Sequence, residues 1–308
     1  MGGRGGARMK KYRDIAGDGG SNIVGQVEAQ QARLRSRLAR IRRSVAVVSG
    51  KGGVGKSTVT ANLAAAFALS GSAVGVLDAD LNGPSMAKLL GIRGQPLTTG
   101  ADGVEPPRSA LGVRAMSMDL LLAGDRTPLA WEATTQAESH TWRGTMEANA
   151  LREFLADTAW GDLDVLILDV APGADRLPTV LGLVPGLAGV VVVTIPSEVS
   201  HLVVGKSITA ARQAGAAVLG LVENMAGYVC ADCGAVNPLF SGPGGQALAA
   251  EFGVPFLGAV PFDPRLAAAA DRGLAFVAAD AQTPAARALL ALAATLRAAL
   301  EPAAGARA

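Results

Sequence analysis

The 308-residue sequence predicts an α/β protein built on a mostly parallel, doubly wound sheet. Three observations predict this class. Short apolar runs rich in β-branched residues recur between segments of helical character, as in parallel strands that are buried on both faces. A glycine-rich loop separates the first of these runs from the first helical segment. Half of the residues are apolar, which suffices for one large domain or two small ones.

The first 43 residues read as a basic N-terminal arm ahead of a domain that spans residues 44–308. They hold eleven Lys and Arg against three Asp and Glu, whereas the rest of the chain holds 17 against 23. Residues 1–26 offer little to bury, so we expect disorder there. Residues 27–43 place apolar side chains at near-helical spacing among arginines, which predicts a helix packed on the domain edge. Nucleic acid or acidic lipid is the alternative partner of this helix.

No secretory signal and no membrane partner are expected. The start of the chain lacks an apolar central run, and the Ala-rich stretches are interrupted well short of about 18 residues. We therefore expect a cytoplasmic protein. In a reducing compartment, two cysteines at C-x-x-C spacing favour metal binding or redox chemistry over a structural disulfide.

The expected elements alternate along the chain. The strands are residues 45–49, 73–80, 164–169, 189–196 and 217–224, and the helices are residues 56–70, 147–158, 199–214 and 283–300. Residues 90–143 are rich in Gly and Pro, so we expect them to be irregular apart from a strand at residues 113–118.

The loop SGKGGVGKST, residues 49–58, is the strongest functional signal, because residues 50–57 satisfy G-x-x-x-x-G-K-[ST] between a strand and a helix. Its glycines let the backbone wrap closely around a phosphate, and the N–H groups form one anion-binding nest. The predicted phosphate-binding residues of this nest are Gly50, Gly52, Gly53, Val54 and Gly55. Lys56 is expected on the β- and γ-phosphates of ATP, Ser57 on Mg²⁺ and Thr58 on the α-phosphate.

Three acids follow strands that neighbour this loop. Asp78 and Asp80 end the second strand, and alternation along a strand would put both on one face. Such acids can hold a water or a metal-bound water, although capping of the next helix is the alternative. Asp169 closes an apolar strand, the Walker B pattern, and is expected to hold Mg²⁺ through water.

Both cysteines of the chain lie in YVCADCG, residues 228–234. A thiolate metal site usually needs four ligands, and the chain offers Cys230 and Cys233. The pair is therefore a redox couple, ordinary core, or half of a site that a second copy of the chain completes. Four thiolates suit either a [4Fe-4S] cluster or a tetrahedral Zn²⁺.

These motifs together resemble the Mrp/ApbC family of P-loop iron-sulfur carrier ATPases, over roughly residues 43–273. The resemblance rests on the glycine-rich loop, LDADLNGPS, WRG at residues 142–144, VENM at residues 222–225, the C-x-x-C pair and GVPFLGAVPFDP at residues 253–264. A second lysine in the loop, Lys51, is the mark of the wider MinD-like group with a deviant Walker A loop.

The resemblance implies a homodimer that binds and hydrolyses ATP with Mg²⁺. The C-x-x-C cysteines of two subunits would hold one bridging [4Fe-4S] cluster, which is passed to apo-proteins. It further implies that Lys51 reaches the partner's nucleotide, Asp80 orients the attacking water, Asp78 lies beside the Mg²⁺ shell and Asn224 hydrogen-bonds the adenine.

Two departures from the family pattern stand out. Where the family has DxPPGTGD, this chain has DVAPGADR, residues 169–176, so Arg176 replaces the final acid and hydrolysis is expected to be slow. Extra sequence at residues 132–140 predicts a longer loop before WRG. A positioning or partitioning ATPase that dimerises on DNA or membrane is the alternative function, and the C-x-x-C pair argues against it.

Overall fold

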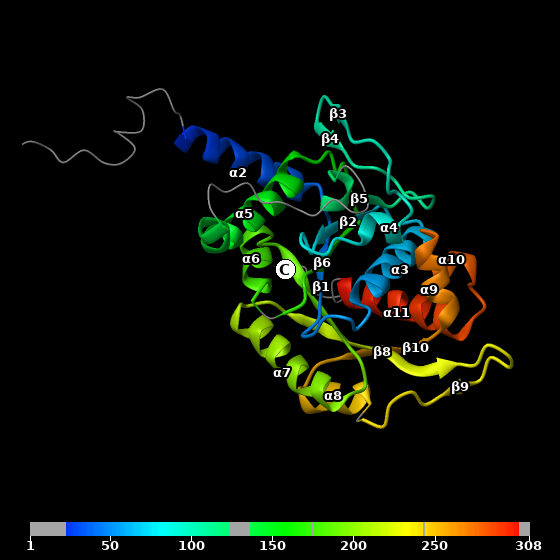
Figure 1. Cartoon of the computed structure of the whole chain (residues 1–308). Coiled ribbons are helices and arrows are strands. Elements are labelled where there is room, and N and C mark those ends of the chain that lie inside the picture. The colour runs from blue at the N-terminus through cyan, green and yellow to red at the C-terminus, as the bar shows by residue number, and fades with distance from the viewer. Residues whose placement is uncertain (1–22, 123–135, 174, 243, 302–308) are drawn as a thin grey trace, which may run out of the picture.

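The computed structural model describes residues 23–122, 136–173, 175–242 and 244–301, and it centres on an eight-stranded sheet (Figure 1). The strand order is β10-β8-β7-β1-β6-β2-β5, with β9 paired to β8. All pairs along this path are parallel, and β9 alone runs antiparallel to its neighbour. The predicted fold class is thereby confirmed.

The strands of this sheet are β1 (Ser44–Val48), β2 (Val74–Ala79), β5 (Arg114–Met116), β6 (Val165–Val170), β7 (Leu187–Thr194), β8 (Val218–Val229), β9 (Val236–Asn237) and β10 (Phe256–Phe262). A separate antiparallel hairpin pairs β3 (Thr98–Gly100) with β4 (Gly103–Glu105). The expected strands are all present. However, β8 continues five residues beyond the expected end at residue 224, because β10 and then β9 pair with its extension.

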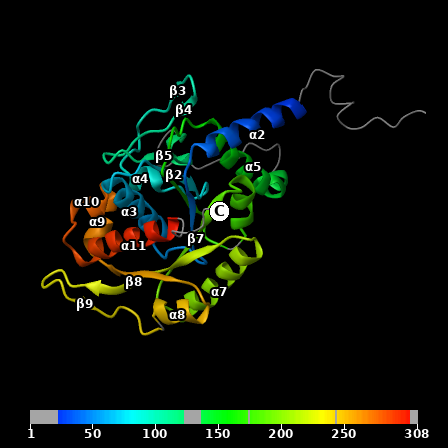
Figure 2. The same ribbon diagram turned by 180° about the vertical axis from the view of Figure 1, so that it is seen from behind.

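Helices cover both faces of the sheet (Figures 1 and 2). One face carries α3 (Lys56–Leu69), α4 (Met86–Leu89), α9 (Pro264–Asp271), α10 (Phe276–Ala279) and α11 (Pro284–Leu300). The other carries α2 (Ile23–Ala39), α5 (Gln136–Asp157), α6 (Leu177–Leu183), α7 (Glu198–Gln213) and α8 (Gly245–Glu251), and a short 3-10 helix spans Met118–Leu120. Val45 and Val47 of β1 face the first layer, and Ala46 and Val48 face the second. Burial on both faces explains why these strands read as unbroken apolar runs.

The central sheet positions a site at its carboxyl edge. In such sheets, ligands bind beyond the carboxyl ends of the strands, where successive crossovers diverge to opposite sides. The chain leaves β1 for β2 on one side, whereas β7 lies on the other side of β1. The glycine-rich loop follows β1, so the fold puts it at this divergence.

The basic arm contains a helix, but its bounds differ from the expected residues 27–43. Helix α2 spans Ile23–Ala39, so residues 23–26 are helical rather than disordered. The chain leaves the helix before residue 43 because Ile41 bridges to Leu163, just ahead of the central strands β1 and β6. The predicted disorder of residues 1–22 lies outside the described residues.

Arginines of helix α2 and of the residue that follows it pair with the domain. Arg33 pairs with Asp157 at 3.0 Å, Arg40 pairs with Asp162 at 2.9 Å, and Leu34 is buried against the second core layer. Exposed pairs of this kind contribute little stability, but they engage cations that a polyanion would need. The helix thus packs on the domain as predicted, while nucleic acid or acidic lipid as its partner and the domain boundary at residue 43 stay predictions.

The expectation that residues 90–143 are irregular apart from one strand is wrong in two places, since β3 and β4 form a hairpin and α5 begins at Gln136. Of the longer loop expected at residues 132–140, residues 132–135 lie outside the described part and residues 136–140 are helical. Gln, Ala and Glu favour helix, and extending an existing helix adds one hydrogen bond for each residue fixed. In the described segments, no helix is both long and apolar enough to cross a bilayer.

Candidate functional site

The glycine-rich loop connects β1 to α3 and has the backbone that its sequence predicts. Gly53 and Gly55 adopt left-handed conformations with φ of 80° and 79°, which side chains disfavour. A Cβ on Gly50 would lie 2.7 Å from the backbone oxygen of Val203 in α7. The loop therefore needs glycine for both its curvature and its contact with α7.

A cavity lies against this loop and the first turn of α3. Its lining is Ser49, Gly52, Gly53, Val54, Gly55, Lys56, Ser57, Thr58, Asp80 and Pro172. The free N–H groups at the start of α3 and the helix dipole favour an anion here. The structure thus brings nearly all the predicted phosphate-binding residues to one cavity, together with Asp80.

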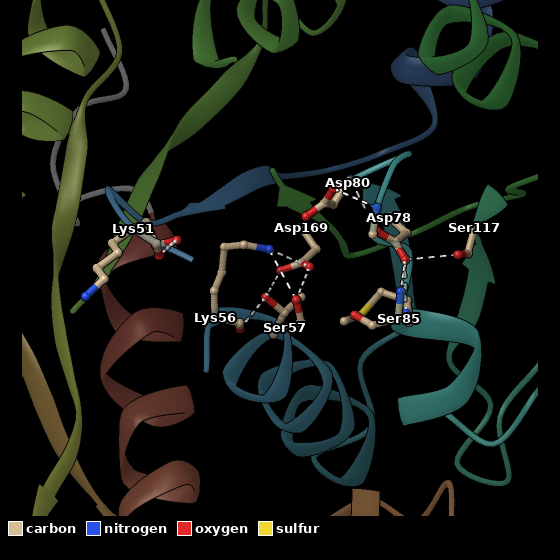
Figure 3. Close-up of polar contacts among 12 residues, drawn as sticks. Lys51, Lys56, Ser57, Asp78, Asp80, Ser85, Ser117 and Asp169 are labelled. Atoms are coloured by element: carbon tan, nitrogen blue, oxygen red, sulfur yellow. Dashed lines mark hydrogen bonds and ion pairs between the residues drawn. The ribbon is translucent and has the colours of Figure 1, made fainter. Parts of the chain in front are cut away.

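Asp169, at the end of β6, is the buried centre of a polar cluster beside the cavity (Figure 3). Lys56 Nζ lies 2.6 Å from its Oδ2, and the Ser57 hydroxyl donates to the same oxygen at 2.7 Å. Thr60 donates to Oδ1 at 2.6 Å. The Lys56 ammonium at the start of α3 suits a phosphate, while the Ser57 hydroxyl and the Asp169 carboxylate supply oxygen atoms that suit Mg²⁺.

Asp78 is fully buried and accepts four hydrogen bonds. Its Oδ2 accepts from the N–H groups of Ser85 and Met86 at 2.9 and 3.0 Å and from the Ser117 hydroxyl at 2.9 Å, and its Oδ1 accepts from the Asp80 N–H at 3.2 Å. Burial and then the negative charge of Asp169 raise the pKa of Asp78 from 3.8 to about 7. The bonds from Ser85 and Met86 cap the start of α4, as the alternative interpretation of this acid predicted. A role of Asp78 beside the Mg²⁺ shell stays a prediction.

Asp80 lies in a different setting from Asp78. Strand β2 ends at Ala79, so strand alternation does not govern Asp80, and the side chain is half-buried at the cavity wall. Its Oδ1 accepts from the Gly83 N–H at 3.1 Å. A carboxylate in this place can orient a water toward a phosphate bound by the loop.

Lys51 and Asn224 differ in their environment, since one is exposed and the other is buried against the loop. Lys51 is exposed and points away from the Lys56–Asp169 cluster (Figure 3), which leaves it available to another chain. Asn224 is buried and donates from Nδ2 to the Val54 carbonyl at 2.8 Å. It therefore supports the loop, and contact with adenine stays a prediction.

Both cysteines lie in the turn that joins β8 to β9, on a hairpin that projects from the body of the molecule (Figure 1). Hydrogen bonds to the Cys230 sulfur lower the pKa of its thiol. The backbone N–H groups of Cys233 and Asp232 make the largest contributions, and the Cys233 side chain makes a smaller one. Cys230 is half-buried and Cys233 is exposed. The turn thus stabilises the thiolate, the form that binds metal.

Within the part of the chain that the structure describes, no three His, Cys, Asp or Glu residues group as a metal site. The chain holds two cysteines, so a site of four thiolates on this turn would need two more from a second chain. Inert core thiols do not fit the exposure of the turn.

Sequence reasoning missed Thr60, Ser117 and Glu147. Thr60 lies four residues beyond Lys56 on α3, one turn along the same face, so helical periodicity could have identified it. Ser117, just after β5, donates a hydrogen bond to Asp78. Glu147 accepts hydrogen bonds from Asn82 and Arg176, which lie in two other loops. No local pattern indicates these pairings.

Comparison with known proteins identifies the family to which the chain belongs. The family model ParA, described as NUBPL iron-transfer P-loop NTPase, matches residues 40–297. An iron-sulfur cluster carrier protein of Saccharolobus solfataricus is 45% identical over 252 residues, which cover 82% of this chain and 81% of the relative. One from Methanocaldococcus jannaschii is 41% identical over 252 residues, covering 82% and 83% respectively.

Solved structures agree on the fold. A nucleotide-binding protein from Archaeoglobus fulgidus in complex with ADP is 37% identical, with a TM-score of 0.67 over 79% of this chain and 91% of that one. The cell division ATPase MinD of Pyrococcus furiosus is 22% identical, with a TM-score of 0.57 over 83% and 99%. The second similarity concerns the fold alone.

Proposed function

The chain belongs to the NUBPL iron-transfer family of P-loop NTPases, and on this basis we propose that it is an ATP-hydrolysing carrier of iron-sulfur clusters. The observation that carries the proposal is the C-x-x-C turn, whose backbone N–H groups favour the Cys230 thiolate on an exposed hairpin. A positioning ATPase has no need of such a turn. The relatives named iron-sulfur cluster carrier proteins support the same choice.

We propose that the cargo is a [4Fe-4S] cluster bridged between two copies of the chain. Each copy supplies Cys230 and Cys233, and a two-fold axis doubles these to the four thiolates that one such cluster takes. Recipients are apo-proteins that need the cluster. A reducing compartment such as the cytoplasm suits the two free thiols.

Nucleotide binding follows from the loop cavity. The glycine-rich loop and Lys56 would hold the phosphates of ATP, while Ser57 and Asp169 would hold Mg²⁺. When bound, Mg²⁺ neutralises charge on the β- and γ-phosphates. Asp80, at the cavity wall, would orient the attacking water, and the exposed Lys51 would reach a nucleotide in the partner subunit.

Anaerobic reconstitution with iron and sulfide tests the cargo. We expect about four irons per dimer and transfer to an apo-enzyme that requires a [4Fe-4S] cluster. Cys230→Ser and Cys233→Ser should each lose the iron, because oxygen is a poor substitute for thiolate at a soft metal centre. Ala235→Ser, in the same hairpin, is the control that keeps both thiols.

Two results would contradict the carrier proposal. One zinc per dimer in place of iron would make the turn a structural site. A Cys233→Ser protein with its full iron content would remove the turn from cluster binding altogether.

A further inference from the structure

Glu147, on α5, connects two loops that both reach the nucleotide cavity. Its side chain is 7% exposed. Oε1 accepts a hydrogen bond from Asn82 Nδ2 at 2.8 Å, and Oε2 forms an ion pair with Arg176. Asn82 follows β2 and Arg176 follows β6, so one buried carboxylate contacts the loops of two separate strands.

The first loop carries Asp80. Asn82 lies two residues beyond it, and the Gly83 N–H bonds to both the backbone and the side-chain oxygen of Asp80 at 3.3 and 3.1 Å. This tight turn makes the orientation of Asp80 depend on the position of residues 82 and 83. The bond from Asn82 to Glu147 therefore anchors the turn from outside the cavity.

The second loop carries Pro172, which lines the cavity, and Gly173, whose N–H donates to the Ser49 carbonyl at 3.0 Å. Arg176 ends this loop and is the N-cap residue of α6. Its pairing with Glu147 consequently fixes the far end of a segment whose near end contacts the glycine-rich loop.

The Glu147 carboxylate and the Arg176 guanidinium carry opposite charges at this connection. A buried carboxylate is unfavourable unless it is paired, and the Arg176 guanidinium offsets part of the cost of burying Glu147. The ion pair therefore joins the two loops at a buried position, where removing one partner would leave the other charge uncompensated.

We propose that Glu147 is a positioning residue for ATP hydrolysis, which holds the Asp80 loop in one arrangement with Arg176, at the start of α6. The inference rests on the proposed ATPase activity. Glu147 acts through Asp80 and the cavity wall, and it does not line the cavity itself. Nucleotide binding depends on the glycine-rich loop and Lys56, so it should survive loss of Glu147.

The test compares Glu147→Gln and Asn82→Ala with Arg152→Ala, a control on the same helix whose guanidinium bonds locally to Asn149. Displacing a catalytic group by about 1 Å can reduce turnover by about 100-fold, so we expect kcat to fall about 10- to 100-fold in both variants. KM and the affinity for a fluorescent ATP analogue should change less than about twofold, since ground-state binding is retained. The control should match the wild type.

A double variant separates positioning from general damage. Adding Arg176→Gln to Glu147→Gln should reduce kcat little further, because both changes break the same connection. Asn82 is exposed, so Asn82→Ala should fold even where Glu147→Gln does not, and its kcat then decides the matter. A melting curve for each variant monitors folding.

The outcomes distinguish the two proposals. A wild-type protein that binds ATP without hydrolysing it would overturn the proposed ATPase activity. A wild type that hydrolyses ATP, with a folded Asn82→Ala variant at the same kcat, would overturn the role of Glu147 and leave the carrier function intact.

Discussion

Thr60 allows a quantitative test of how Asp169 is held at the end of β6. Its side chain is fully buried, and its hydroxyl lies 2.6 Å from Asp169 Oδ1. Lys56 and Ser57 contact the other oxygen, Oδ2. Replacing Thr60 by Val keeps the shape and the β-branch but removes the donor, so Oδ1 loses its hydroxyl partner in a buried place.

The size of the effect follows from this geometry. A hydrogen bond to a charged group contributes about 1.5–3 kcal/mol. Valine fills nearly the same volume, so little cavity arises, and we expect Thr60→Val to lower the free energy of unfolding by about 2 kcal/mol. In a domain of this size the melting temperature should fall by roughly 3–4 °C.

Chemical denaturation of Thr60→Val and Thr60→Ser measures this loss. Serine keeps the donor and removes one methyl group, which costs about 1 kcal/mol at a buried position. The more apolar valine should therefore be the less stable variant, against the trend of hydrophobic burial. A valine variant as stable as the wild type, or more stable than the serine variant, would refute the reasoning.

Three further predictions concern the cavity and its acids. Lys56→Ala should lose tight ATP binding by ~3 kcal/mol or more, because phosphate is left without its buried cation; titration with a fluorescent nucleotide checks this, and normal affinity would remove the loop from phosphate binding. Asp80→Ala should bind ATP normally and lose about 100-fold or more in turnover, since water orientation matters in the transition state; an unchanged phosphate-release rate would exclude that role. The pKa of Asp78 is raised to about 7 in the folded protein, so the folded chain binds more protons than the unfolded chain between about pH 4 and 7. Its contribution to stability should be greatest below about pH 4 and decline as pH rises toward 7, and denaturation midpoints across this range should depend less on pH in Asp78→Asn.

Much of the site could be predicted because its motifs are contiguous. The glycine-rich loop needs only its own backbone conformation and the strand and helix that flank it. The C-x-x-C pair likewise forms within one turn, whose N–H groups come from residues 232 and 233. Asp78 was harder to interpret, because its partners Ser85, Met86 and Ser117 depend on where later segments pack.

Local pattern and spacing were enough to predict the fold class, the phosphate-binding loop, the acid at the end of β6 and the paired thiols. The contacts among Asn82, Glu147 and Arg176, across separations of 65 and 29 residues, arise from the fold alone. The physical reason is that a parallel sheet brings the loops after β2 and β6 to one edge, while α5 must pack across them to bury its apolar face. A carboxylate on that helix can then contact both loops, and no sequence spacing specifies such a contact.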